Sequence, residues 1–414
     1  MKNTERATII RSRAPKLIGT ALLCAALSSG VSGSALSEGS HPGLAPAKGV
    51  WLTCFSKKRV LFSDTAAREF IAFCSKADIK EVYLQLYRAD KAYYDSSITD
   101  RSEYDKMAAA FGSDPIFFLA KEADRKGIKV YAWINVLCVA KNETSTVLKK
   151  FGKSVLTMDQ RQRPSMRGEK TDRSDRFYLR DEQIFLEPGD PRVVEYAVSI
   201  VDEVLKRYPM LNGVHLDYIR YPHPVPYIPD SRFLTHGISY GYGKKNVERF
   251  SAKTGLDPLT MKFSPANALL WDNWKRDQVT ALVTAISKRV RERSSRYEVS
   301  CAVLPSPERA YLAAYQDWPL WLSRGIVDSV VLMNYTIDNR LAGEILRSAL
   351  AHRGKGAVLA GMGVFLVKDP AAFAEQYEVF AGTDPDGIVF FSYDELAAMG
   401  DPAVEMITGG LRDE

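Results

Sequence analysis

Eight short apolar runs recur along the chain from residue 49, separated by longer segments whose apolar positions follow a helical period. Each run is rich in β-branched and aromatic residues, as buried strands are. The runs are GVWLTCF (49–55), EVYLQLYR (81–88), KVYAWINV (129–136), GVHLDYIR (213–220), EVSCAVLP (298–305), SVVLMNY (329–335), AVLAGMGVF (357–365) and GIVFFSY (387–393). Strands and helices that alternate in this way predict parallel βαβ units.

This alternation predicts an α/β fold, and eight units predict a closed (β/α)8 TIM barrel. An open doubly wound sheet is the alternative, but no G-x-G-x-x-G motif follows the first run. The chain beyond residue 49 exceeds the ~250 residues typical of such barrels. The excess forms two insertions, residues 137–189 after the third strand and residues 221–269 after the fourth. Because barrel enzymes build their sites after strand ends, we expect the insertions to wall a cleft.

Three neighbouring strands are expected to direct polar and aromatic side chains toward the barrel axis, because side chains alternate along a strand. When the apolar residues of the second, third and fourth strands face the helices, the inward set is Tyr83, Gln85 and Tyr87, then Tyr131, Trp133 and Asn135, then His215 and Asp217. Branched aliphatic residues dominate a purely structural barrel interior. The pattern therefore predicts a catalytic or binding site at the carboxyl ends of these strands.

Asp217 is the strongest candidate for a catalytic residue, because a carboxylate inside an apolar strand needs hydrogen-bonding or charged partners. Its alternative role is a structural pair with Arg220. A carboxylate among aromatic rings is typical of glycosidic bond cleavage, which needs a second carboxyl group. Glu308 follows the fifth strand, beside the fourth, and is the second candidate; its alternative role is a carboxylate favoured by a helix start. The other candidate acids are Asp317, Asp338 and Asp394.

Other chemistries lack their motifs in this sequence. The five histidines, at positions 41, 215, 223, 236 and 352, form no H-x-H or H-E-x-x-H motif, so we expect no metal centre. There is no G-x-S-x-G nucleophile motif and no phosphate-binding P-loop. We therefore expect no cofactor.

The N-terminus has the order of segments of a secretory signal. A basic stretch ends at Lys16, an apolar stretch covers residues 17–27, and small residues fill 28–35. The apolar stretch is shorter than the ~20 residues of a membrane span. We therefore expect a signal peptide (1–35), a linker (36–48) and one barrel domain (49–414) in an exported protein, periplasmic or secreted. An uncleaved anchor, or a lipid anchor at Cys24, is the alternative.

Charge adds little beyond this segment. The formal net charge is +6, but the first sixteen residues carry much of it, and the rest of the chain is close to neutral. A near-neutral body lacks the basic footprint of a nucleic-acid-binding protein. We therefore expect no nucleic-acid partner, and the sequence leaves the oligomeric state open.

The run GVHLDYIRYP (213–222) resembles the glycosyl-hydrolase-like family ten, a group of TIM-barrel glycosidases of bacterial envelopes. Asp217 matches the acidic position of that motif. Departures are Glu187, where the family often has Asp or Asn, and Tyr131, where a histidine is common. Other segments resemble the family in the same order: KGVWLT (48–53), LQLYRADKAYYDS (84–96), YAWINV (131–136), FLEPGDPRVVEY (185–196), WDNWKRDQVTALV (271–283) and QDWPLWLSRGIVDSVVLMNY (316–335). The resemblance implies action on an envelope glycan, with peptidoglycan strands as the target class.

Together these features predict an exported glycoside hydrolase with two catalytic carboxyl groups. Asp217 would be the nucleophile or base, held ionised by Arg220 or His215, and Glu308 the proton donor. The residues expected to bind the glycan are Gln85, Tyr87, Arg88, Trp133, Asn135, His215, Tyr218, Arg220 and Tyr335. The rival functions are a non-catalytic glycan-binding barrel of the envelope and a metal-dependent polysaccharide deacetylase.

Overall fold

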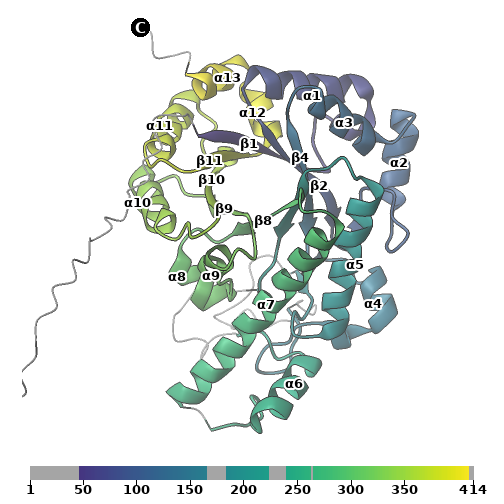
Figure 1. Cartoon of the computed structure of the whole chain (residues 1–414), viewed down its shortest axis with the longest axis vertical. Helices are drawn as coiled ribbons and strands as arrows, with labels where there is room; N and C mark the ends of the chain where they lie inside the picture. Colours follow the sequence, from purple (N-terminus) through teal and green to yellow (C-terminus); the bar gives the residue numbers. More distant parts are fainter. Residues whose placement is uncertain (1–45, 166–182, 223–238, 263, 410–414) are drawn as a thin grey trace, which may run out of the picture. The chain divides into compact units, whose positions relative to one another are not determined.

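The computed structural model describes residues 46–165, 183–222, 239–262 and 264–409. Eight parallel strands form a closed barrel in chain order, and the predicted (β/α)8 TIM barrel is confirmed (Figure 1). Strand β1 (Ala47–Leu52) closes the ring, because it pairs with both β2 (Glu81–Arg88) and β11 (Gly387–Phe391). Between them lie β4 (Lys129–Asn135), β7 (Gly213–Asp217), β8 (Glu298–Val303), β9 (Ser329–Asn334) and β10 (Ala357–Gly363).

Helices follow the strands in turn and cover the outside of the barrel (Figure 1). They are α1 (Asp64–Lys76), α3 (Pro115–Asp124), α5 (Pro191–Arg207), α7 (Pro265–Arg293), α9 (Trp318–Ser323), α10 (Asn339–Leu350), α11 (Pro370–Ala381), α12 (Tyr393–Met399) and α13 (Asp401–Thr408). The Asp-Pro pair at 190–191 begins α5, because the Asp190 carboxylate caps the Arg192 N–H and proline suits the first helical position.

Both predicted insertions are present, and their described parts hold regular structure. The first contains β5 (Cys138–Ala140), α4 (Thr146–Phe151), the 3-10 turn η2 (Lys153–Val155) and β6 (Ile184–Phe185); the second contains α6 (Lys244–Thr254). Shorter additions are η1 (Val60–Phe62), β3 (Lys91–Ala92) and α2 (Ser102–Phe111), α8 (Pro307–Arg309), the π-helix η4 (Ala310–Ala314) and η5 (Val364–Leu366).

A buried carboxyl group joins the two insertions. Glu187 accepts hydrogen bonds from the Tyr221 hydroxyl at 2.5 Å, the Gly189 N–H at 3.1 Å and the Gly243 N–H at 3.2 Å. Burial raises the pKa of Glu187 above its ordinary value, against the effect of these donors. A side chain at Gly243 would meet the Glu187 side chain at 2.7 Å, so this close approach requires glycine.

Strand side chains alternate between two cores. The outward residues of β2, β4 and β7, such as Leu84, Ala132 and Leu216, pack in the large core between barrel and helices. A separate cluster fills the barrel interior and consists of Trp51, Tyr83, Tyr131, Trp133, Val331, Leu359 and Val389. The predicted inward positions of Tyr83, Tyr131 and Trp133 are therefore confirmed.

The expected signal peptide (1–35), including Cys24, and nearly all of the linker lie outside the described residues and stay predictions. In the described ranges, none of the helices combines the length and apolar character of a membrane span.

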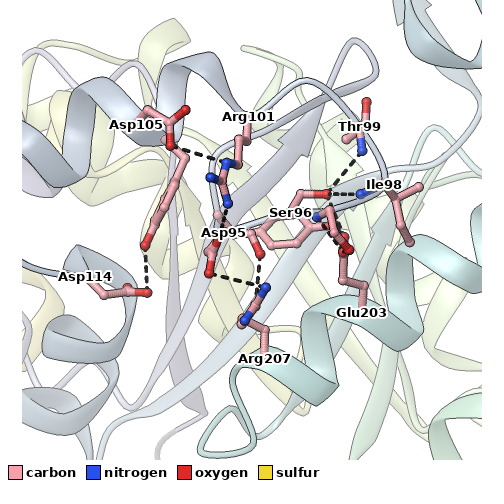
Figure 2. A network of polar contacts seen from close by, with 12 residues as sticks. Asp95, Ser96, Ile98, Thr99, Arg101, Asp105, Asp114, Glu203 and Arg207 are labelled. Carbon is pink, nitrogen blue, oxygen red and sulfur yellow. Dashed lines mark hydrogen bonds and ion pairs between the residues drawn. The ribbon is translucent and has the colours of Figure 1, made fainter.

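A polar network fixes the segment after β3 onto α5 (Figure 2). The Glu203 carboxylate accepts hydrogen bonds from the Ser96 hydroxyl at 2.6 Å and from the Ser97 N–H at 2.6 Å. One turn later, Arg207 donates to the Asp95 carbonyl oxygen at 3.1 Å and pairs with its carboxylate at 3.3 Å. Because the Glu203 carboxylate accepts hydrogen bonds from several donors of this loop, its charge stabilises the turn that leads from β3 to α2.

We predict that Glu203→Gln lowers the free energy of unfolding by about 1–3 kcal/mol, the range for charge-assisted hydrogen bonds. Burial raises the pKa of Glu203, but hydrogen bonds from Ser96 and Ser97 outweigh it, so the net pKa is lowered. The stabilisation is therefore present above the carboxyl pKa of an unfolded chain and is lost as the pH falls through the folded-state value.

Urea unfolding at pH 7 and at acid pH measures this difference. Glu195→Gln is the matched control, because Glu195 is an exposed residue of the same helix. Equal unfolding midpoints for the wild type and Glu203→Gln at pH 7 would contradict the stabilising role.

Candidate active site

A pocket of about 400 Å³ opens at the carboxyl ends of the barrel strands. This is the end at which TIM-barrel enzymes carry their active sites, and the volume suits a small ligand. The lining residues are Trp51, Thr53, Phe55, Gln85, Arg88, Trp133, Asn135, Asp217, Tyr218, Arg220, Ala302, Met333, Tyr335 and Phe391. Every barrel strand except β10 has one of them at or next to its carboxyl end.

Asp217 is buried at the wall of this pocket, where two fixed donors hold its carboxyl group. The Trp133 indole N–H donates to Oδ2 at 3.0 Å, and the Tyr218 backbone N–H donates to Oδ1 at 2.6 Å. Tyr218 has a φ of 52°, a left-handed conformation that is costly for a tyrosine. Such strain is typical of functional sites, and here it accompanies an N–H that points back at the carboxyl group.

The pKa of Asp217 is raised above its ordinary value, and burial is the cause. The Tyr218 N–H, the positive charge of Arg220, the Trp133 indole and the charge of Arg88 each act in the opposite direction without cancelling it. A carboxyl group with a raised pKa can hold its proton nearer to neutral pH, which is what a proton donor requires.

The pocket has a polar half and an apolar half. The neighbouring strands β2, β4 and β7 and the residues just after them supply the polar half, Gln85, Arg88, Asn135, Asp217 and Arg220, together with the rings of Trp133 and Tyr218. The apolar half comes from β1, β8, β9 and β11: Trp51, Ala302, Met333, Tyr335 and Phe391. The ring centroid of Phe391 lies 5.8 Å from that of Trp51 and 5.8 Å from that of Tyr335. Sugars have polar edges and apolar ring faces, so the two halves match a sugar.

His215 lies in the barrel interior below the pocket and does not line it. The Trp51 indole N–H donates to His215 Nε2 at 3.1 Å, and Nδ1 lies 2.9 Å from the Ser300 hydroxyl. Because an indole N–H can only donate, Nε2 accepts and the proton is assigned to Nδ1. Burial lowers the pKa of His215 to about 3, so the ring is neutral. The expectation that His215 holds Asp217 ionised and binds the glycan is therefore wrong; it orients Trp51.

Tyr87 also differs from its predicted place. A register shift between Gln85 and Tyr87 pairs Tyr87 with Ile134, an outward residue of β4. The extra residue reverses the side-chain alternation. Tyr87 therefore packs in the outer core, where its hydroxyl donates to Asp90 at 2.7 Å, and Arg88 takes the inward position.

Glu308 is exposed in the first turn of α8 and is absent from the described residues that line the pocket. Its carboxylate accepts a hydrogen bond from Ser306 at 3.1 Å, as expected for its alternative role at a helix start. The structure does not bring it together with Asp217. The other candidate acids also serve elsewhere: Asp317 and Asp338 cap α9 and α10, and Asp394 accepts from the Ser56 hydroxyl at 2.6 Å.

Of the predicted residues, Gln85, Arg88, Trp133, Asn135, Asp217, Tyr218, Arg220 and Tyr335 do line the pocket. The residues missed from the sequence are Trp51, Thr53, Phe55, Ala302, Met333 and Phe391. The alternation rule, applied to the first and last strands as well, would have indicated Trp51 and Phe391, since their neighbours Val50, Leu52 and Phe390 lie in the outer core.

Two further expectations concern the surroundings of the pocket. The described parts of the two insertions contribute no lining side chain; Phe185 of β6 instead packs behind Tyr218 with centroids 6.0 Å apart. Within the ranges that the structure describes, there is no group of three or more histidine, cysteine, aspartate or glutamate side chains that could hold a metal ion.

Comparison with known proteins gives a family match. A family model described as "Glycosyl hydrolase-like 10" matches residues 46–356. Glycosyl hydrolase DigH of Escherichia coli (strain K12) is 24% identical over 328 residues, which are 72% of this chain and 67% of that protein. Glycosyl hydrolase YngK of Bacillus subtilis (strain 168) is 22% identical over 277 residues, 63% of this chain and 46% of that protein, so the match spans about half of YngK.

Solved structures resemble the fold. The glycoside hydrolase domain of PgaB (BpsB) from Bordetella bronchiseptica has a TM-score of 0.59 at 14% identity, covering 87% of this chain and 98% of that one. The catalytic domain of β-amylase from Paenibacillus polymyxa has a TM-score of 0.55 at 11% identity, covering 88% of this chain and 98% of that one. At such identities the likeness concerns the barrel alone.

We predict that His215→Asn flattens the dependence of stability on pH in the acid range. An unfolded histidine binds a proton below pH ~6.5, whereas the folded ring stays neutral down to about 3. The wild type therefore loses up to about 1.4 kcal/mol of stability per pH unit as the pH falls through this window. Urea unfolding between pH 7 and pH 4 measures the slope.

The control for this slope is His352→Asn, at an exposed position. It should leave the slope as in the wild type. A His215→Asn protein with the wild-type slope would contradict the neutral, buried state of the ring.

Proposed function

Because the chain belongs to the glycosyl hydrolase-like 10 family, we propose that it hydrolyses glycosidic bonds in a bacterial envelope polysaccharide, with peptidoglycan strands as its substrate. Family membership gives the reaction class, glycoside hydrolysis, and a glycan as substrate. The observation that carries the proposal is the buried carboxyl group of Asp217 in the wall of a half-aromatic pocket at the catalytic end of the barrel.

Asp217 is the proton donor in this proposal. The Trp133 indole and the Tyr218 N–H fix its carboxyl group, so it need not reorganise when the leaving oxygen approaches. Burial raises its pKa, which favours the protonated form. This differs from the role of nucleophile or base that the sequence suggested, because His215 is neutral and, among the described residues, Arg220 and Asp217 form no ion pair that would keep Asp217 charged.

The apolar half of the pocket would stack against a sugar ring, and the polar half would bind its hydroxyl groups. Trp51, Tyr335 and Phe391 present aromatic surfaces, and Gln85 and Asn135 present amides that are 3.4 Å apart. This division orients a sugar by its two faces and brings the scissile bond to the carboxyl side.

The substrate assignment has support from the N-terminus. A signal peptide over residues 1–35 would export the barrel domain to the compartment in which peptidoglycan lies, and a lipoprotein signal cleaved before Cys24 would instead leave it attached there through Cys24. The domain boundaries expected from the sequence are part of this proposal.

We predict that Asp217→Asn lowers kcat about 10²–10⁴-fold, the usual contribution of a positioned proton donor. The wild type and variant are incubated with peptidoglycan, intact and stripped of its peptides, and the released fragments are analysed by mass. New reducing ends indicate hydrolysis. Full activity in Asp217→Asn, or anhydro ends in the products, would contradict the proposal.

Glu308→Gln is the second variant to compare with the wild type. A two-carboxylate reaction needs a second carboxyl group, and Glu308 is the candidate that the sequence suggests. Because Glu308 is exposed and outside the pocket lining, we expect this variant to keep most of its activity. A loss as large as that of Asp217→Asn would instead assign Glu308 a catalytic role. Binding without wild-type cleavage of any glycan would favour the non-catalytic barrel, and stoichiometric zinc in the purified protein would favour the deacetylase.

The pH profile gives a separate prediction. A proton donor is lost as the pH rises through its pKa, so kcat/KM should fall on the alkaline side, at a pH above the ordinary aspartate value. The charge of Arg220 lowers the pKa of Asp217, so Arg220→Gln should move this limb to higher pH. A shift to lower pH would contradict the assigned electrostatics.

A further inference from the structure

Two arginines stand on the polar half of the pocket, on either side of β4. Arg88 is the last residue of β2, and Arg220 follows Asp217 by three residues at the end of β7. Both side chains are half-buried and both line the pocket. Because β4 alone separates β2 from β7, the two strands are about 10 Å apart, within the combined reach of two arginine side chains.

Aromatic rings hold each guanidinium group. The Arg88 guanidinium lies 4.8 Å from the centroid of Phe55, and that of Arg220 lies 5.0 Å from the centroid of Tyr218 and 5.8 Å from Phe185. Stacking of this kind occupies the face of a guanidinium and leaves the N–H groups in its plane free to donate. The two groups are thus oriented before any ligand arrives.

The hydrogen-bonding capacity of these groups is largely unused within the described residues. Arg88 has its ring contact there and no ion pair or hydrogen bond, and Arg220 makes one long hydrogen bond, 3.4 Å to the Tyr221 carbonyl oxygen. The Arg220 Nε is buried without a hydrogen-bond partner in the described part of the chain. Both Asp217 oxygens already accept from Trp133 and Tyr218, so the nearby carboxyl group does not consume the guanidinium donors.

Two cations and one carboxyl group give this pocket a positive charge even when Asp217 is ionised. A buried, unpaired donor on a charged group is costly unless a ligand satisfies it. The planar fork of arginine matches a carboxylate better than a hydroxyl group, because it donates two parallel hydrogen bonds.

We propose that Arg88 and Arg220 bind a free carboxylate carried by a sugar unit of the substrate, so that the enzyme selects acidic glycans over neutral ones. This inference rests on the proposed glycosidase function and adds the chemical class of the sugar. The alternative for the same residues is that they act only through Asp217, by lowering its pKa. In that case they would affect acidic and neutral substrates equally.

The test uses peptide-free strands of N-acetylglucosamine and N-acetylmuramic acid with free carboxylates, and the same strands after conversion of the carboxylates to primary amides. The wild type should cleave the free-acid strands with a kcat/KM at least about tenfold higher, as loss of a charge-assisted bond implies. Arg88→Gln and Arg220→Gln should lose most of this preference, because KM should rise by a larger factor on the free-acid strands than on the amidated strands.

Three further variants control this result. Arg309→Gln removes an exposed positive charge outside the pocket lining and should keep the wild-type preference. Arg88→Lys and Arg220→Lys keep the charge and lose the planar fork, so they should show an intermediate preference, and thermal unfolding checks that all variants fold. A polyuronate, whose carboxylate is attached to the ring itself, distinguishes that source of the charge from the ether-linked carboxylate of muramic acid.

Equal wild-type cleavage of the free-acid and amidated strands would overturn the inference and leave the glycosidase proposal intact. An equal loss on both strands in Arg88→Gln and Arg220→Gln would also overturn it, in favour of an effect through Asp217. If the wild type cleaves neither strand, the proposed function fails. Calorimetric binding of the same two strands then tests the inference by itself. Equal affinities would overturn it, and tighter binding of the free-acid strand would support it.

Discussion

The site depends on the fixed position of one buried carboxyl group, that of Asp217. The barrel register pairs Trp133 with His215 and Asn135 with Asp217, so the Trp133 indole stands next to the end of β7 and donates to Asp217. The second donor is the N–H of Tyr218, whose left-handed conformation points it back at the same group. Strand pairing therefore sets the first donor, and the backbone turn that follows β7 sets the second.

The order of strands then determines what surrounds this acid. Strands β2, β4 and β7 are neighbours and bring the charged and amide side chains to the pocket, whereas β8, β9, β11 and β1 complete the ring with mainly apolar ones. Trp51 reaches the pocket floor because His215 accepts its N–H and because Gly361 has no side chain; a Cβ at Gly361 would lie 2.9 Å from the Trp51 ring. The neutral His215 and Gly361 thus support the apolar half of the pocket without lining it.

The sequence predicted most of this arrangement, because a strand period of two separates inward from outward residues without any further information. It placed Asp217, Trp133, Asn135 and Gln85 correctly for that reason. It placed Tyr87 wrongly, because a bulge depends on how β2 pairs with β4, which the period does not reveal. Glu308 lies beyond a strand end, where side-chain direction follows the local turn of α8 instead of the barrel register, so its distance from Asp217 was beyond sequence reasoning.

A crystal structure of the Asp217→Asn variant with a bound peptidoglycan oligosaccharide tests the central claim most directly. We expect a glycosidic oxygen within about 3.2 Å of the side chain at position 217, with the adjoining sugar ring against Trp51 or Tyr335. A glycan bound in the same crystals with its glycosidic bonds away from that side chain, for example beside Glu308, would contradict it.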